Sequence, residues 1–360
     1  MVNHPNVETI DQYTCPNCDG NLIFDPNSQS LRCPYCETLV SLVSEEVIEE
    51  YEFERYKQQG LTWDQDVHSF QCEACGASLV TEAHISSLNC PYCGSSHVVQ
   101  LNLPIGLRPE GVLPFRIDKQ EAFQRFTQWL PKQWLAPNDL KRRYRANPPS
   151  GVYLPYWTYD AQTKSTYHGR GGKYYYTTRR VNGRTTQTRH TRWYSVTGHI
   201  DHSFDDVCVC ASSRFEDELL DHLAPFRTKC AVPYDGGYLS GYAAEHCSLS
   251  VEEGFTLAKE KMKETLESLA ESEIERTYDT SCDIHLRTSY TNVTFKQLLI
   301  PIWASTYDYK GKTYHYLING DTGKVYGKTP VSVVKVIFLT LFIAIIVFYL
   351  LWGDFFLTYY

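Results

Sequence analysis

Hydrophobic and polar positions follow different periods in different parts of the chain. Over residues 118–130, Ala122, Phe126 and Leu130 recur at the four-residue spacing of one helix face, which predicts a helix. From Val152 onward, alternation with period two and many aromatic residues predict strands. Asn182-Gly183 lies between two such runs and predicts a hairpin, because a type I′ turn needs two residues that tolerate positive φ.

A second helix is expected from Ser250 to about Ser272. Ser250 and Glu253 have the spacing of a capping box, and an apolar stripe follows that we expect to be core: Phe255, Ala258, Met262, Leu266 and Leu269. Strands are expected again after it. Leu154 to Trp157 (LPYW) and Ile300 to Trp303 (IPIW) each follow an expected helix, so this region is interpreted as two related α+β halves.

The last hydrophobic run has the pattern of a membrane span. Residues 336–352 carry no charge, and extending the run back to residue 331 admits only Lys335. A helix of that length covers roughly 26–33 Å, the thickness of a bilayer core. Tyr349 and Trp352 near its end favour a span over a buried core helix. With Lys324 and Lys328 also before the run, we predict a single-pass cell-membrane protein whose N-terminal part is cytoplasmic.

The N-terminal part contains a duplicated cysteine module. Two Cys-x2-Cys pairs separated by 14 residues recur after a shift of 57 residues: Cys15, Cys18, Cys33 and Cys36, then Cys72, Cys75, Cys90 and Cys93. Four thiolates in two such pairs suit tetrahedral Zn²⁺ and leave no open coordination position. We therefore predict two structural zinc ions in two zinc ribbons. No signal peptide precedes them, so a reducing compartment is expected.

Charge argues against nucleic-acid binding by the ribbons. The net charge is −8, residues 13–40 contain one basic residue (Arg32), and residues 70–99 contain none. The connector between the modules, 44–60, is predicted to be an acidic helix. Binding to phosphates requires lysines and arginines that displace counterions. Partner proteins are therefore the expected ligands of the ribbons, and nucleic acid is not expected to bind there.

Positive charge is concentrated between residues 141 and 192. Aromatic side chains are interleaved with it, which is typical of surfaces that bind anionic lipid or single-stranded nucleic acid. A solvated hairpin that binds neither is the third interpretation. The candidate polyanion-binding residues are Lys141, Arg142, Arg143, Arg145, Arg179, Arg180, Arg184, Arg189 and Arg192.

Signals for an enzyme are weak, and we predict a protein that is not one. Gly311-Lys312-Thr313 and Gly327-Lys328-Thr329 lack the earlier glycine of a phosphate-binding loop. The histidines, acids and cysteines between His199 and Cys210 could in principle gather around a metal, but the region reads as strands and a turn. No nucleophile and base pattern is present.

The ordered motifs resemble a bacterial family of double-zinc-ribbon, membrane-anchored proteins. They are the two ribbons, VLPFRIDKQEAFQRFTQWL, GVYLPYWTYDAQTKSTYHGRGG, SVTGHIDHSFDDVCV, PYDGGYLSGYAAE and the run from TFKQLLIPIW to YLINGDTGKVYGKTP. Members often carry a primosomal helicase label, which the missing phosphate loop contradicts. The resemblance implies a non-enzymatic partner of phage-shock-like and flotillin-like (SPFH) membrane proteins, in envelope stress or membrane organisation.

Together these patterns predict an α+β protein with two zinc ribbons, an aromatic-rich body and one transmembrane helix. The expected domains are ribbon 1 (1–40), an acidic helical linker (41–68), ribbon 2 (69–100), two body halves (101–245, with the basic hairpin, and 246–330), the transmembrane helix (331–352) and a short tail (353–360). The predicted function is a membrane-anchored scaffold that docks partner proteins. The alternative is a nucleic-acid-associated factor of replication or transcription that uses the basic hairpin.

Overall fold

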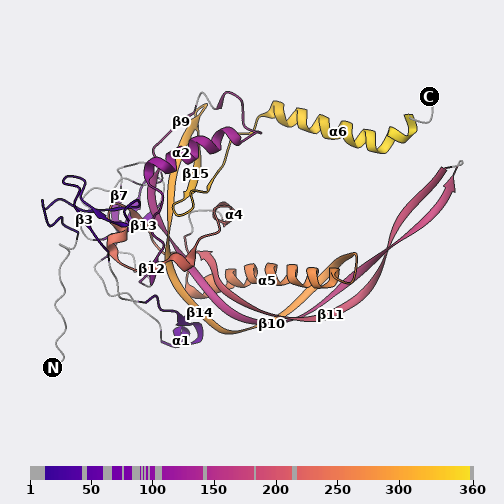
Figure 1. Cartoon of the computed structure of the whole chain (residues 1–360), viewed down its shortest axis with the longest axis horizontal. Helices are drawn as coiled ribbons and strands as arrows, with labels where there is room; N and C mark the ends of the chain where they lie inside the picture. The colour runs from indigo at the N-terminus through magenta and orange to yellow at the C-terminus, as the bar shows by residue number, and fades with distance from the viewer. Residues whose placement is uncertain are drawn as a thin grey trace.

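The computed structural model describes residues 13–42, 47–59, 67–74, 77–82, 90, 92, 95, 98–101, 108–140, 144–181, 184–212 and 217–356. Three long antiparallel strands dominate it: β10 (Ser150–Val181), β11 (Arg184–Cys210) and β14 (Thr280–Tyr309), with β10 in the middle. They form a curved arm that projects from one end of the molecule (Figure 1). The pairing of Val181 with Arg184 confirms the predicted hairpin.

Helix α5 (Val251–Glu275) covers the concave side of these strands (Figure 1). It begins with the predicted capping box, in which Ser250 and Glu253 bond each other's backbone N–H groups. The buried stripe matches the predicted one except at its end, where Ala270 is buried and Leu269 is exposed. After Leu266, the buried face of the helix therefore continues four residues later, at Ala270, and not three residues later, at Leu269.

The third strand and the helix both stop before the hairpin does. The last residue of β10 that pairs with β14 is Gly172, opposite Thr280. The ring of Tyr278, just after α5, occupies the space that a Cβ at Gly171 would need. We call the part beyond this point, residues 173–181 and 184–192, the arm tip. It is a two-stranded ribbon without the third strand or the helix.

Short strands extend the sheet around the roots of the long ones. β8 and β12 lie on one side of β14, β15 and β16 continue it, and β13 leads from β10 to β6, β5 and β7, while β4 and β9 also pair with β14. Their bounds are β4 (Tyr51–Glu52), β5 (Val67–Cys72), β6 (Ser78–Glu82), β7 (Val98–Leu101), β8 (Gly111–Val112), β9 (Arg145–Ala146), β12 (Val232–Pro233), β13 (Ala243–Glu245), β15 (Lys312–Asn319) and β16 (Val325–Gly327).

Apart from α6, described below, the remaining helices are short. The predicted helix at 118–130 is confirmed as α2 (Lys119–Trp129), capped by the Asp118 side chain. In the acidic connector, helix α1 is confined to Phe53–Gln59, because Tyr51 pairs with Phe295 in a strand instead. The others are η1 (Leu130–Lys132), α4 (Asp217–Asp221), η2 (Thr228–Cys230) and η3 (Gly236–Leu239).

Two tryptophans make equivalent contacts in the two halves of the body. Trp157 donates its indole N–H to the carbonyl of Leu249 at 2.9 Å, and Trp303 donates to the carbonyl of Ile117 at the same distance. Each carbonyl lies one residue before the cap of a helix, α5 or α2. The LPYW and IPIW motifs lie side by side, with Leu154 opposite Ile300. That the two parts of the body are related halves stays a prediction.

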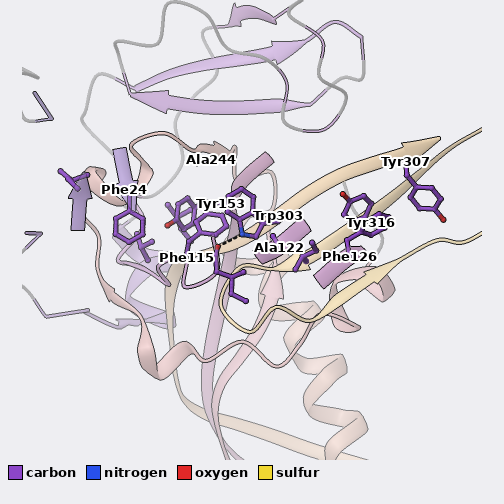
Figure 2. Close-up of a cluster of buried hydrophobic side chains, with 14 of the residues drawn as sticks. Phe24, Phe115, Ala122, Phe126, Tyr153, Ala244, Trp303, Tyr307 and Tyr316 are labelled. Carbon is purple, nitrogen blue, oxygen red and sulfur yellow. Dashed lines mark hydrogen bonds between the residues drawn. The ribbon is translucent and has the colours of Figure 1, made fainter. Parts of the chain in front are cut away.

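An aromatic core fills the space around Trp303 (Figure 2). Phe115 contacts the rings of Tyr153 and Trp303 with centroids 5.0 and 4.9 Å apart, and Phe126 of α2 stacks on Tyr316 of β15. Rings of this size bury large apolar areas, so this cluster contributes much of the body's stability.

Helix α6 (Val333–Phe356) follows the body, as the hydrophobic run predicts. Its start is tied to the loop after η1. Ser332 donates its N–H to the carbonyl of Leu135 at 2.8 Å, and the Lys335 ammonium donates to the carbonyls of Trp134 and Ala136 at 2.8 and 2.6 Å. Lys335 is thus a structural contact at the helix base.

The predicted transmembrane helix at 331–352 is contradicted. Among the residues that the structure describes, no helix combines the length and the apolar character needed to cross a bilayer. The prediction of a single-pass protein in the cell membrane with a cytoplasmic N-terminal part depended on this helix and is contradicted by the same finding.

Candidate metal centre and basic arm tip

Ribbon 1 brings its four cysteines to one point. The sulfurs of Cys15, Cys18, Cys33 and Cys36 all lie within 4.8 Å of one another. The Cys15 and Cys36 sulfurs, and likewise those of Cys18 and Cys33, are 3.4 Å apart. β1 (Ile23–Asp25) and β2 (Ser30–Arg32) lie between the pairs, and β3 (Leu39–Val40) follows the second pair; the three strands form a small separate sheet. The tetrad can hold one metal ion.

Each cysteine pair is shaped by a tight turn. Cys15 donates its N–H to the carbonyl of Gly20 at 2.8 Å, and Cys33 donates to that of Thr38 at 2.9 Å. Within these turns Asp19 and Glu37 have φ of 57° and 61°. Positive φ costs an L-residue roughly 1 kcal/mol, so the ribbon accepts local strain to aim its sulfurs inward.

The donor set fits zinc. Thiolates are the preferred ligands of structural Zn²⁺ sites, and four of them complete a tetrahedron. A hydrogen bond with the Thr38 hydroxyl, 3.1 Å away, lowers the pKa of the Cys36 thiol to about 5, whereas the neighbouring sulfurs of Cys36 and Cys33 raise the pKa of Cys18 to about 12. Cys36 is therefore the sulfur of this pair that ionises first. With no open position for a substrate, such a site supports the fold and performs no chemistry.

Ribbon 2 repeats the turns of ribbon 1. Cys72 donates its N–H to the carbonyl of Ala77 at 2.8 Å, and Cys90 does so to that of Ser95 at 2.8 Å, each over the same five-residue step. Both cysteines are buried. Cys75 and Cys93, the other two predicted ligands, lie outside the described residues. The sheet of ribbon 2 is also joined to the body, because Val80 of β6 pairs with Ala244 of β13.

Ribbon 1 is fixed to the body by hydrogen bonds and shared core. Phe24 donates its N–H to the carbonyl of Ser240 at 3.0 Å, and the Gln29 side chain donates to the carbonyl of Phe115 at 2.8 Å. Cys15, Leu22 and Phe24 belong to the same buried cluster as Phe115 and Trp303. Ribbon 1 is therefore a wall of the body and not a separate domain.

A groove of about 710 Å³ lies between ribbon 1 and the body. Apolar side chains line it from both sides, including Pro34 of the ribbon and Tyr242 and Trp303 of the body. Charges of both signs lie among the lining residues: Asp25, Arg32, Glu37, Asp118 and Lys119. The groove therefore combines an apolar lining with charges of both signs.

The predicted basic residues do not form one patch. Arg179, Arg180, Arg189 and Arg192 lie in the arm tip, and Arg184 begins β11 there. Arg145 lies in β9, which pairs with β14 at Tyr307 and Asp308, at the opposite end of β14 from the arm tip. Lys141, Arg142 and Arg143 lie outside the described residues. Only the arm tip therefore carries a described cluster of these residues.

Aromatic rings hold the basic side chains of the arm tip against the ribbon. The Arg189 guanidinium lies 4.4 Å from the centre of the Tyr174 ring, and that of Arg192 lies 5.6 Å from Tyr175. Tyr175 stacks on His190 across the ribbon at 5.2 Å. Cation–π contacts of this kind orient a guanidinium without neutralising it.

A cluster of charged side chains lies at the arm root, the part of the arm in which β10, β11 and β14 pair together. It was not among the sites predicted from the sequence. The Lys296 ammonium lies 2.7 Å from a Glu50 carboxylate oxygen and 2.8 Å from one of Asp206. Asp160 accepts the Asp206 N–H at 2.7 Å, and burial raises the pKa of Asp160 to about 6. The three carboxylates are close enough to hold a cation, and Lys296 supplies one. The sequence pattern did not predict this cluster, because its members lie far apart in the chain, with Glu50 and Lys296 separated by 246 positions.

These features define a protein with an N-terminal four-cysteine metal site on a mixed, sheet-rich body. No family model matches the chain. A Bacillus subtilis (strain 168) protein named Uncharacterized protein YdjG is 31% identical over 341 residues, covering 91% of this chain and 92% of that protein. The chain therefore belongs to the same family as YdjG. No solved structure matches it.

Proposed function

We propose that this protein is a non-catalytic, zinc-stabilised adaptor that docks an extended segment of a partner protein in the groove beside ribbon 1. The observation that carries the proposal is that one wall of the groove belongs to the metal-binding module and the other to the body. A closed four-thiolate site has no role in turnover, so its contribution is to hold that wall in place.

The same proposal includes a second zinc ion in ribbon 2. The repeated turns at Cys72 and Cys90 support it, as do the glycines at positions 76 and 94 of the sequence. These positions correspond to Asp19 and Glu37, where the backbone of ribbon 1 has positive φ. Glycine adopts that conformation without strain, so the second module is built for the same turn.

The lining chemistry supports a protein ligand. Three acids and two basic residues around an apolar floor would repel neither sign of peptide strongly but would disfavour a nucleic acid. The resemblance described above supplies the candidate partners, phage-shock-like and flotillin-like (SPFH) proteins.

Photo-crosslinking in the full chain tests this function. A crosslinking amino acid at Pro34 should trap a discrete partner protein, identified by mass spectrometry, whereas the same group at Lys312, exposed at the start of β15, should not. Arg32→Glu, which changes an exposed charge of the groove, should reduce the Pro34 adduct while leaving the zinc content unchanged. Identical adducts at both positions, or none at Pro34, would show that the groove does not dock a partner.

A further inference from the structure

The arm tip is a ribbon that the rest of the molecule leaves uncovered. Its strands pair without interruption from Lys173 opposite Arg192 to Val181 opposite Arg184. Nine residues in each strand give a length of about 30 Å. An isolated two-stranded ribbon is marginally stable in water. Contact with a ligand would therefore stabilise the arm tip.

The arm tip is basic, whereas the rest of the chain has a negative net charge. Residues 173–192 contain six lysines and arginines and no acid. Subtracting these six charges from the net charge of −8 leaves −14 on the remaining residues. Among the residues that the structure describes, no carboxylate pairs with Lys173, Arg179 or Arg189. A polyanion should therefore be attracted to the arm tip more strongly than to the rest of the chain, whose net charge is negative.

The basic side chains lie on both faces of the ribbon. Successive residues of a strand point to opposite faces, so Lys173 and Arg179 share the face of Gly171, next to α5, and Arg192 joins them through its pairing with Lys173. Arg180 and Arg189 lie on the other face by the same alternation. A flat bilayer surface can meet only one of these faces.

The remaining side chains of the arm tip also argue against a lipid surface. Threonine and tyrosine predominate, and Val181 is the only aliphatic residue from 173 to 192. The segment thus lacks apolar residues to enter a bilayer. Threonine, tyrosine and arginine all donate hydrogen bonds to phosphate oxygens.

We propose that the arm tip binds double-stranded nucleic acid by lying in a groove of the duplex. The major groove of DNA, about 12 Å wide, admits a two-stranded ribbon, and phosphates line both of its walls. Arginines on both faces can then contact phosphates, and the rings of Tyr174 and Tyr175 orient Arg189 and Arg192 without neutralising them. The contacts are to the backbone, so the binding is independent of sequence. This inference does not depend on partner docking in the ribbon 1 groove.

The test uses the full chain and a fluorescent duplex of about 20 base pairs with mixed sequence. Six phosphate contacts predict a salt slope near −5, so affinity should fall about 10³-fold between 50 and 200 mM salt. Arg179→Gln with Arg180→Gln removes two contacts and should weaken binding about 50-fold at 0.1 M salt and reduce the slope by about 2. Lys132→Gln with Lys312→Gln, which removes the same charge from exposed body positions, should change neither.

Two other ligands, single-stranded DNA and anionic vesicles, test whether the arm tip prefers a duplex. Single-stranded DNA of the same length should bind more weakly, and vesicles of phosphatidylcholine and phosphatidylglycerol should not bind through the tip. The proposal is overturned if the duplex does not bind at 50 mM salt, if the arm-tip variant binds as well as the native chain, or if single strands or vesicles depend on the arm tip more strongly than the duplex does. Unchanged zinc content and melting temperature in both variants exclude misfolding.

Discussion

Ribbon 1 and the arm tip lie at opposite ends of the molecule (Figure 1) and are ordered by different means. In ribbon 1, Cys15, Leu22 and Cys33 are almost fully buried in a core shared with the body. In the arm tip, Tyr175 and Tyr176 are 45% and 56% exposed, and strand pairing is the interaction that extends along its whole length. Ribbon 1 depends on a metal and a core, so it should unfold when either is removed. The arm tip, in contrast, should be dispensable for folding of the rest of the chain.

The largest effect is expected from loss of the first metal site. Cys33→Ser or a zinc chelator should unfold ribbon 1, because a module of this size lacks a sufficient core without metal. Hydrogen exchange should become fast for residues 13–42 while residues 251–309 stay protected. Cys282→Ser, outside both ribbons, is the matched control. Retained protection of residues 13–42 after metal removal would mean that the shared core alone orders the ribbon.

The second effect concerns α5, which covers the arm root but not the arm tip. Leu266→Ala should lower the free energy of unfolding by about 2–4 kcal/mol, because it leaves a cavity against the strands. Leu269→Ala removes the same atoms from the exposed face and should cost well under half as much. Urea denaturation measures both. Equal losses would show that the helix does not pack as described.

A smaller, pH-dependent effect is expected at the arm root. Burial raises the pKa of Asp160 to about 6, above the ~3.9 of an unfolded chain, so the folded state holds the proton more tightly. The stability that Asp160 contributes is therefore present below pH ~4 and lost as the pH rises through 6. Asp160→Asn keeps an acceptor for the Asp206 N–H and cannot ionise.

This variant should exceed the native chain in stability by about 1 kcal/mol at pH 8, after allowance for partial exposure, and match it near pH 4. Thermal unfolding across that pH range measures the difference. Asp201→Asn, an exposed position of β11, should show no such dependence. A difference for Asp160→Asn that is constant with pH would mean that ionisation of Asp160 is not its cause.

The smallest effect is expected from the arm tip itself. Replacing residues 174–191 with Asn-Gly joins Lys173 to Arg192, which are already paired, through a favourable hairpin turn. The melting temperature should change by less than about 2 °C, because no buried contact is lost. A larger fall would show that the arm tip supports the sheet, and the contrast with ribbon 1 would disappear.

Local patterns predicted several elements well. The four-residue spacing and the caps at Asp118 and Ser250 identified α2 and α5, and Asn182-Gly183 identified the hairpin, because these signals depend on residues close together in the chain. The cysteine spacing likewise predicted the tetrad of ribbon 1. The prediction of a transmembrane helix was wrong, since it extrapolated from one hydrophobic run.

Long-range contacts were beyond the reach of these patterns. The sequence by itself determined that four cysteines meet, that two helices begin at their caps, and that a basic segment forms a hairpin, because neighbouring residues decide each of these. Only the tertiary structure decided that ribbon 1 is a wall of the body and that Lys296 joins Glu50 to Asp206. It also decided that α5 ends before the hairpin does and leaves the arm tip bare. Those outcomes depend on which surfaces bury one another, and burial is a property of the whole folded chain.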